Sequence, residues 1–376
     1  MAPNLTPTIP TEMKAARITT YGAPYTLTTV PVPSPSSLGP HDLLVKVAAA
    51  SHCHTDTIVR NGVFGTRLPC TGSHEGAGTV VLTGSSSSTA FRPGDRVMCG
   101  LPLHPCGVCA ECTTGPENQR QYCTVVAGHV GVHLDGCFAE YVLVDARHTT
   151  PVPDGVSLLS AAPLACAGRT IWRGVKIAGL AEGEWLAIIG SGGGLGHIGV
   201  QFAKALGLRV VGVDARDGGL ALTSEMGAEV VVDARQGRES VVEEVSRVTG
   251  GNGGVDAAIV LADSEDAAAL ACALTRMHGT VVQIAQPEEV RIPFQELVFR
   301  DIRIRGSVLC SPGESEEMMK FVAEHGIEVR TNVFRGLERI GELVDAVERG
   351  EVKGKAVVVV DEEQIRRERE RGPGAA

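Results

Sequence analysis

A short apolar segment that leads through glycines into a helix-like segment constrains the fold of this chain more than any other feature. Residues 185–190 read WLAIIG, four more glycines follow closely, and residues 197–207 read HIGVQFAKALG. In this last stretch apolar residues recur at helical spacing, and a glycine ends it. A strand, a glycine turn and a helix in this order are typical of a parallel sheet that is covered by helices.

Strand-like and helix-like segments continue to alternate after this turn. The strand-like runs are RVVGVD, EVVVDA, VDAAIVLA, TVVQIA and IRIRGSV, and helical stretches such as RESVVEEVSRVTG and SEDAAALACALTRM separate several of them. This alternation predicts a doubly wound α/β domain. Before about Leu164, short β-type runs broken by glycine and proline favour an irregular antiparallel β domain instead.

With 376 residues, the chain exceeds one ordinary core, and we expect about two domains. We predict a β-rich domain at 1–165, the α/β domain at 166–310, and a return to the first domain with a C-terminal tail at 311–376. From about Gln364 the chain reads QIRRERERGPGAA, which predicts a solvated or frayed terminus.

Composition excludes several classes of function. A net charge of −10 argues against nucleic-acid binding, which requires a basic surface. No run of eighteen apolar residues is present, so no membrane span is predicted. The N-terminus lacks the basic start and apolar core of a secretory signal. The eleven cysteines include a closely spaced group, which favours metal ligation in a reducing compartment over disulfides. We therefore expect a cytoplasmic protein.

The glycine-rich turn is a candidate site for a pyrophosphate. Glycines let the backbone approach a phosphate, which then lies at the positive N-terminal end of the following helix. Strictly, the G-x-G-x-x-G pattern fails, because Ser191 occupies its first glycine position. The strand–turn–helix context nevertheless predicts binding by Gly192, Gly193, Gly194, Leu195 and Gly196.

Asp214 ends the second strand of the α/β segment, about twenty residues after the glycines. A carboxylate there can accept hydrogen bonds from both ribose hydroxyls and would repel a 2′-phosphate. Taken alone, it is more commonly a solvated loop residue. The turn, the helix and the acid together predict a dinucleotide site that favours NAD over NADP, although Arg216 is available to bind a phosphate.

Four closely spaced cysteines form a candidate metal site. Within eighteen residues the chain places Cys106, Cys109, Cys112 and Cys123. Four thiolates suit tetrahedral zinc and leave no position for a substrate. The alternative is a loop with free cysteines. A structural zinc would hold together a lobe that has little apolar core of its own.

Several motifs, taken in order, resemble those of zinc alcohol dehydrogenases of the medium-chain dehydrogenase/reductase superfamily, near its yeast-type branch. They are CHTD at 53–56, GSHEGAG at 72–78, the CxxCxxC lobe, DGCFAEY at 135–141, CAGRT at 166–170 and GGLG at 193–196. The resemblance extends from about Lys14 to Val360. It implies an α/β protein in which a GroES-like, β-rich catalytic domain is interrupted by a doubly wound Rossmann domain.

The resemblance also implies a second zinc, with a catalytic role. Spacing alone does not select its ligands, which the family motifs identify as Cys53, His74 and Cys166. This set leaves an open fourth position, and two zinc ions per chain are then expected. Glu75 resembles a nearby carboxylate that approaches the metal when the fourth ligand exchanges, and Asp56 resembles the acid that orients the histidine.

Four further positions match the family in its substrate and cofactor sites. Thr55 matches the hydroxyl that hydrogen-bonds the substrate oxygen. His54 and Lys355 match residues near the pyrophosphate, with lysine standing where arginine is common. Thr170 matches a residue that packs behind the nicotinamide.

Three departures from the family pattern concern proton transfer, the lobe and the substrate pocket. The family's proton relay often ends in a histidine at the position where this chain has Ile58. His104 is one candidate for the group that removes the proton instead, and the alternative is that His104 is a surface residue of the lobe. The last gap of the lobe has ten residues, whereas the family usually has seven. The loop around Phe64 is short, and Leu101 and Leu103 are aliphatic, which predicts room for a bulky apolar substrate.

We therefore predict an enzyme that transfers a hydride between NAD(H), with NADP possible, and a small-molecule alcohol/carbonyl pair. We also expect a homodimer or homotetramer. One alternative is a zinc-containing reductase of an iminium or conjugated alkene, for which the missing relay histidine matters little. The other is a non-catalytic dinucleotide-binding protein, against which the intact zinc ligands argue because binding alone needs no open zinc.

Overall fold

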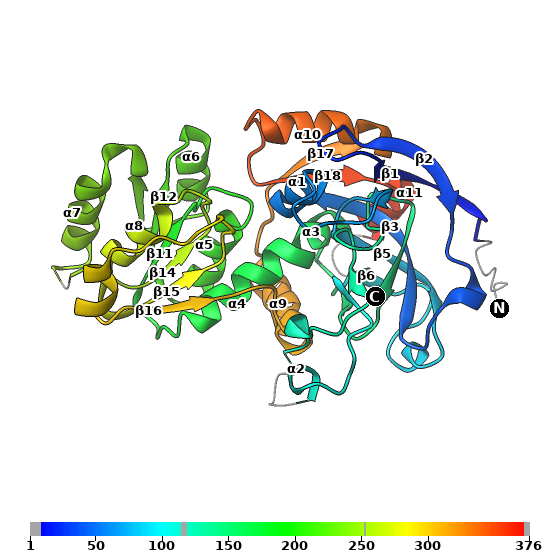
Figure 1. Ribbon diagram of the computed structural model, residues 1–376, viewed down its shortest axis with the longest axis horizontal. Helices are drawn as coiled ribbons and strands as arrows, with labels where there is room; N and C mark the ends of the chain where they lie inside the picture. Colours follow the sequence, from blue (N-terminus) through cyan, green and yellow to red (C-terminus); the bar gives the residue numbers. More distant parts are fainter. Residues whose placement is uncertain (1–8, 114–118, 252, 372–376) are drawn as a thin grey trace. The chain divides into compact units, whose positions relative to one another are not determined.

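The computed structural model describes residues 9–113, 119–251 and 253–371 (Figure 1). The chain folds as two units. The first unit comprises Met1–Cys166, Ser311–Ala323 and Thr331–Ala376, and the second unit comprises Ala167–Cys310 and Glu324–Arg330.

The prediction assigned 311–376 wholly to the first domain, but residues 324–330 belong to the second unit. Gln201 fixes this segment, because its side-chain amide donates to the Glu328 carbonyl (2.8 Å) and accepts from the Glu328 N–H (2.9 Å). The Arg330 N–H donates to His197 Nε2 at 3.1 Å. These hydrogen bonds satisfy backbone groups of the segment within the second unit.

The first unit is built on a seven-stranded sheet with the order β10-β6-β5-β3-β18-β17, in which β9 also pairs with β3. Its strands are β3 (Asp42–His52), β5 (Glu75–Thr83), β6 (Arg96–Met98), β9 (Tyr141–Asp145), β10 (Thr150–Pro151), β17 (Thr331–Arg335) and β18 (Lys355–Val359). All pairs are antiparallel except β17–β18. A smaller sheet has the order β2-β1-β4, and β7 pairs with β8.

The remaining strands and α-helices of the first unit are mostly short, except α9 with its 14 residues, of which the last two belong to the second unit. They are β1 (Glu12–Ile18), β2 (Thr26–Pro31), β4 (Cys70–Thr71), β7 (Pro102–Leu103), β8 (Gly128–His129), α1 (His54–Arg60), α2 (Ala110–Thr113), α3 (Leu158–Pro163), α9 (Pro312–His325), α10 (Ile340–Glu348) and α11 (Glu362–Arg371). Short β runs and antiparallel pairing agree with the predicted texture of this half.

Strand β3 is the centre of this sheet and positions the site described below. Ten of its eleven residues are buried, as expected for the nearly continuous apolar run LLVKVAAA in a strand that pairs with β5 on one side and with β9 and β18 on the other. The strand ends at His52, directly before Cys53, and β5 begins at Glu75, directly after His74. Ser51 and Glu75 are register partners, so the pairing brings these two chain segments together.

The second unit contains a parallel six-stranded sheet with the order β13-β12-β11-β14-β15-β16. Its strands are β11 (Trp185–Ile189), β12 (Arg209–Asp214), β13 (Val230–Asp233), β14 (Val255–Val260), β15 (Thr275–Gln283) and β16 (Arg303–Gly306). Its α-helices are α4 (Arg169–Ile177), α5 (Gly196–Ala205), α6 (Asp217–Glu225), α7 (Arg238–Val248) and α8 (Ala267–Leu274). The predicted doubly wound sheet is confirmed. The helical stretch SEDAAALACALTRM was predicted too long, because β15 begins at Thr275.

The prediction of a frayed terminus from about Gln364 is wrong as far as Arg371, because these residues belong to α11, which packs against the rest of the first unit. Ile365 is 2% exposed. The Thr79 hydroxyl donates to Gln364 Oε1 at 2.7 Å, and the Leu158 N–H donates to the Glu368 carboxylate at 3.0 Å. Within this highly charged segment, the apolar Ile365 and the polar Gln364 and Glu368 attach the helix to the first unit. Residues after Arg371 lie outside the described ranges.

Across the described ranges, no helix combines the length and the apolar character that crossing a membrane requires.

Candidate functional site

The first unit gathers a mixed cluster of two thiols, an imidazole and a carboxylate. Potential ligand atoms of Cys53, His74, Glu75 and Cys166 all lie within 4.8 Å of one another. Cys53 follows β3 and His74 precedes β5, whereas Cys166 lies in a π-helical turn, Leu164–Gly168. Such turns recur at functional sites, because the extra residue reorients a side chain.

The donor set of the mixed cluster fits zinc. His74 Nε2 is buried and has no hydrogen-bond partner, and a buried polar atom without a partner is costly unless something binds it. The other ring nitrogen, Nδ1, lies 3.2 Å from Asp56 Oδ1. Asp56 Oδ2 accepts a hydrogen bond from the Cys53 N–H at 2.8 Å. Asp56 thus orients two of the potential ligands, as zinc sites commonly require.

The two thiols of the mixed cluster influence each other. A hydrogen bond from Cys166 holds the pKa of Cys53 well below its usual value, although burial opposes this. The same contact, together with burial, raises the pKa of Cys166. The form of cysteine that binds zinc is the thiolate, which the lowered pKa favours at Cys53.

Glu75 is ion-paired inside the mixed cluster rather than free. The Lys355 ammonium, at the start of β18, lies 2.9 Å from Oε1 and 2.7 Å from Oε2 of Glu75. The two side chains are 4% and 0% exposed. Burial raises the pKa of Glu75 to about 7, although the ammonium opposes this. The predicted role of Lys355 at a pyrophosphate stays a prediction, as does that of the exposed His54.

Helix α1 begins directly after Cys53 and presents the candidate proton-transfer residues. Thr55 Oγ1 lies 3.9 Å from Cys53 Sγ. Thr55 and Ile58 are three residues apart, and residues at this spacing lie on the same face of a helix. The position next to the Thr55 hydroxyl on this face therefore carries an aliphatic side chain.

The cysteine lobe, residues 106–123, contains a second set of potential metal ligands. Potential ligand atoms of all four of its cysteines lie within 4.8 Å of one another. Cys123 Sγ is 3.7 Å from both Cys109 Sγ and Cys106 Sγ, and the Cys109 N–H donates to Cys106 Sγ. Four thiols at these distances fit tetrahedral zinc. Residues 114–118 of the long gap lie outside the described ranges.

The entrance to the lobe is fixed by two buried acids that are register partners on β3 and β9, Asp42 and Asp145. His104 Nε2 lies 2.6 Å from Asp42 Oδ1, and the His104 N–H donates to Asp145 Oδ2 at 3.1 Å. The Arg147 guanidinium donates to both Asp145 oxygens, at 2.9 and 2.6 Å. His104, a candidate for the proton's exit, therefore lies in this anchor and not in the mixed cluster.

In the second unit, the glycine-rich turn borders a cavity of about 700 Å³. A Cβ at Gly192 would lie 2.1 Å from the Gly219 carbonyl, and one at Gly196 would lie 2.3 Å from the Gly190 carbonyl. Only glycine fits at such distances. Gly193 lines the cavity, and Gly194 and Leu195 complete the turn before α5.

Asp214 and Arg216 both line this cavity and bind each other. The carboxylate accepts from the Gly192 N–H (3.0 Å) and the Ala215 N–H (2.9 Å), and the Arg216 guanidinium lies 3.2 Å from both oxygens. Thr170 is buried within α4, and its role stays a prediction.

Two residues of this region were not predicted from the sequence. The buried His197 is hydrogen-bonded to the Gly193 carbonyl through Nδ1 at 3.0 Å. Arg238, the first residue of α7, also lines the cavity. It lies five residues after the end of β13, at the N-terminus of α7, and a basic residue that begins the helix after a parallel strand is the signal that could have revealed it.

Comparisons with known proteins agree with this arrangement. The model of the alcohol dehydrogenase GroES-like domain matches residues 39–154, and that of the zinc-binding dehydrogenases matches residues 194–324. An alcohol dehydrogenase of Rhizobium meliloti (strain 1021) is 36% identical over 354 residues, which cover 92% of this chain and 98% of that protein. The chain belongs to the zinc-binding alcohol dehydrogenase family.

Two solved structures of such proteins are similar over their whole length. The alcohol dehydrogenase of Aeropyrum pernix is 30% identical with a TM-score of 0.82, covering 92% of this chain and 99% of its own. A zinc-binding dehydrogenase of Sinorhizobium meliloti 1021, bound to NADP, is 32% identical with a TM-score of 0.78, covering 93% and 99%. The predicted GroES-like and Rossmann domains, and the identification as an enzyme of this family, are confirmed. The yeast-type branch stays a prediction.

Proposed function

We propose that this enzyme transfers a hydride between an alcohol/carbonyl pair and NAD, with zinc held by Cys53, His74 and Cys166. The observation that carries the proposal is the mixed cluster, a buried donor set that fits zinc, in a member of an alcohol dehydrogenase family. A zinc ion at this site supplies Lewis acidity toward the substrate oxygen. A second zinc in the cysteine lobe would serve structure alone.

The chain's own residues support the chemistry in separate ways. Asp56 holds the His74 ring by its Nδ1 nitrogen, which leaves Nε2 for a metal. The Thr55 hydroxyl, beside Cys53 Sγ, is available to accept the proton of a substrate hydroxyl and pass it on. Because Ile58 cannot take that proton further, we propose that it leaves through water.

We propose that NAD is favoured over NADP, because the Asp214 carboxylate at the cavity wall would repel a 2′-phosphate. Asp214→Asn keeps an acceptor for the Gly192 N–H and removes the charge. The ratio of kcat/KM for NAD over NADP should fall about tenfold, in line with the strength of hydrogen bonds to charged groups. Equal efficiency of the native enzyme with both cofactors would contradict the assignment.

We further propose a bulky, apolar substrate. Two observations support it: Leu101 and Leu103 are aliphatic and buried, and the loop after α1 exposes Val63 and Phe64. A second candidate, reduction of an iminium or conjugated alkene, is favoured by Ile58, since that reaction creates no hydroxyl proton to remove.

One assay separates these reactions. The purified enzyme is tested with alcohols, aldehydes, cyclic imines and enones of increasing size, with NAD(H) and NADP(H), before and after treatment with a zinc chelator. We expect the highest kcat/KM for a bulky alcohol or aldehyde and loss of turnover on chelation. Faster reduction of imines or enones would favour the second candidate. Turnover that survives complete zinc removal would refute both.

We also propose that the chain self-associates through the β16 edge of the second unit. This edge strand ends the sheet order, and Phe294, Leu297, Val298, Phe299 and Val308 nearby are all exposed. An open strand edge beside apolar side chains is complementary to a second copy across a twofold axis. Sedimentation should show a dimer or larger species, which Phe299→Glu should weaken. None of the eleven cysteines, all of which lie within the described ranges, is part of a disulfide, and we propose a cytoplasmic location, where thiols stay reduced.

A further inference from the structure

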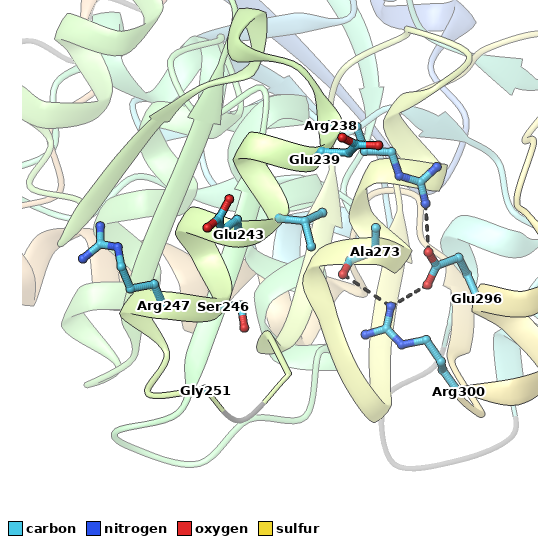
Figure 2. A pocket seen from close by; sticks show the side chains of 10 residues that line it. Arg238, Glu239, Glu243, Ser246, Arg247, Gly251, Ala273, Glu296 and Arg300 are labelled. Atoms are coloured by element: carbon cyan, nitrogen blue, oxygen red, sulfur yellow. Dashed lines mark hydrogen bonds and ion pairs between the residues drawn. The ribbon is translucent and has the colours of Figure 1, made fainter.

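Arg238 lines two cavities of the second unit, the dinucleotide cavity and a neighbouring one of about 660 Å³. Figure 2 shows the second cavity, with the guanidinium groups of Arg238 and Arg300 both directed at Glu296. Arg238 donates to Glu296 Oε1 at 2.8 Å, and Arg300 donates to Glu296 Oε2 at 2.5 Å. Each carboxylate oxygen therefore has its own arginine.

Glu296 belongs to a network that holds it in place. It lies in a π-helical turn, Gln295–Phe299, 58 positions along the chain from Arg238. Arg300 also donates to the Cys272 and Ala273 carbonyls at the end of α8, at 3.2 and 3.3 Å. Glu296 is 18% exposed and Arg238 is 44% exposed. A largely buried carboxylate thus neutralises an arginine that remains accessible from the cavity.

The surroundings of Asp214 contain three arginines, and Arg238 differs from the other two. Arg216 is paired with Asp214, and Arg235 with Asp233 and Asp217, all within eighteen residues of their partners. Arg235 is not among the residues lining the cavity, whereas Arg216 and Arg238 are. Asp214 and Asp233 are register partners on β12 and β13, so the segment leading to Arg238 follows the strand next to Asp214.

We propose that Arg238 determines how strongly the cavity binds a nucleotide 2′-phosphate, and that Glu296 sets this strength. While Glu296 holds the guanidinium, its charge is neutralised and the cavity favours a ribose without the phosphate. A 2′-phosphate that enters beside Asp214 replaces Glu296 as the charged hydrogen-bond partner of Arg238. Glu296 keeps its contact with Arg300, which makes the exchange feasible. This inference rests on the proposed function, in that the cavity binds a dinucleotide.

Calorimetric titration of the full-length protein with ADP and with 2′,5′-ADP tests the proposal without substrate or turnover. Glu296→Gln removes the competing charge, and 2′,5′-ADP should bind up to about fivefold tighter, the range of a partly exposed ion pair. The affinity of this variant for ADP should change by less than about twofold. The matched control is Glu243→Gln, which alters an exposed carboxylate of α7 on the same second cavity and should leave both affinities unchanged.

Arg238→Gln provides the second variant and keeps the Glu296–Arg300 contact. This variant should bind 2′,5′-ADP more weakly by a similar factor, and its affinity for ADP should be unchanged. In the double variant the gain from Glu296→Gln should vanish, because its effect acts through Arg238. If Glu296→Gln and Glu243→Gln behave alike while ADP still binds, the proposal is overturned and the dinucleotide site stands. If neither ADP nor NADH binds the native protein, the proposed function itself fails.

Discussion

The two candidate metal-binding clusters of the first unit are built in opposite ways. The cysteine lobe takes its ligands from eighteen consecutive residues of one loop, and two of its thiols, those of Cys106 and Cys109, are only partly buried. The mixed cluster takes its ligands from the end of β3, the start of β5 and a π-helical turn, and they are largely enclosed. We therefore expect the lobe to depend on a bound metal for its shape, whereas the pairing of β3 with β5 holds ligands of the mixed cluster in place.

The largest effects should come from removing one ligand from each cluster. Cys166→Ser should lower turnover about a thousandfold or more, because a Lewis acid contributes several kcal/mol to the barrier, while the melting temperature changes little. Cys109→Ser should instead lower the free energy of unfolding by several kcal/mol, because metal binding by the lobe is coupled to its folding. Elemental analysis, melting curves and kcat measure the two responses.

The same measurements show whether the comparison holds. The native chain should contain two zinc ions and each variant one. Well under one zinc in the native protein would refute both assignments. If Cys166→Ser unfolded the protein as readily as Cys109→Ser, the mixed cluster would be structural too, and the contrast between the clusters would disappear.

The contrast also explains which features the sequence could reveal. The four lobe cysteines and the strand–turn–helix of the dinucleotide site are contiguous, so spacing alone predicted both. The mixed cluster depends on the register in which Ser51 faces Glu75, and spacing cannot supply a register. Only the resemblance to a family selected Cys53, His74 and Cys166.

Contacts between distant residues were beyond the sequence for the same reason. The ion pair of Glu75 with Lys355 joins positions 280 residues apart. The anchor of α11 depends on where Ile365 and Glu368 meet the first unit, and its charged composition suggested a frayed end instead. Each of these contacts is created by packing, which local patterns do not specify.

The anchor of the lobe should show its importance in stability. Asp145→Asn should lower the free energy of unfolding by about 3 kcal/mol at pH 7, because it leaves the half-buried Arg147 without its charged partner. Burial alone would raise the pKa of Asp145, but the bonds from Arg147 outweigh it and leave the pKa lowered. The carboxylate therefore stabilises the fold above its unfolded-state pKa, and this contribution is lost as the pH falls through the folded-state value.

Denaturant unfolding at several pH values measures this effect. The difference between the native and Asp145→Asn proteins should be full near pH 7 and should shrink below about pH 4. A matched control is Asp135→Asn, a mostly exposed carboxylate near the Arg17 side chain, which should change stability little. A pH-independent difference would mean that shape rather than charge anchors the lobe.

The corresponding acid of the mixed cluster should affect activity rather than stability. Asp56→Asn replaces the acceptor that orients His74, and loss of such a partner typically costs about 10- to 100-fold in metal affinity or activity. The amide still accepts from the Cys53 N–H, so the fold should remain. Zinc affinity, measured by competition with a chromogenic chelator, and kcat report the change. Loss of stability comparable to that of Asp145→Asn would remove the distinction between the two acids.

The smallest expected effect concerns proton transfer next to the mixed cluster. Ile58 lies on the α1 face of Thr55, and a positioned base contributes about a hundredfold or more. A histidine placed at this position should recover part of that contribution. Ile58→His should therefore raise the rate of alcohol oxidation near neutral pH by up to about tenfold, and the rate of carbonyl reduction by less. Ile58→Asn, polar but not basic, is the matched control and should give no gain. Buffer bases should accelerate alcohol oxidation by the native enzyme, because they replace the missing base. They should accelerate oxidation by the Ile58→His variant less. If Ile58→His changes nothing at any pH and buffer has no effect, proton removal does not limit oxidation, and the aliphatic residue at this position has no catalytic consequence.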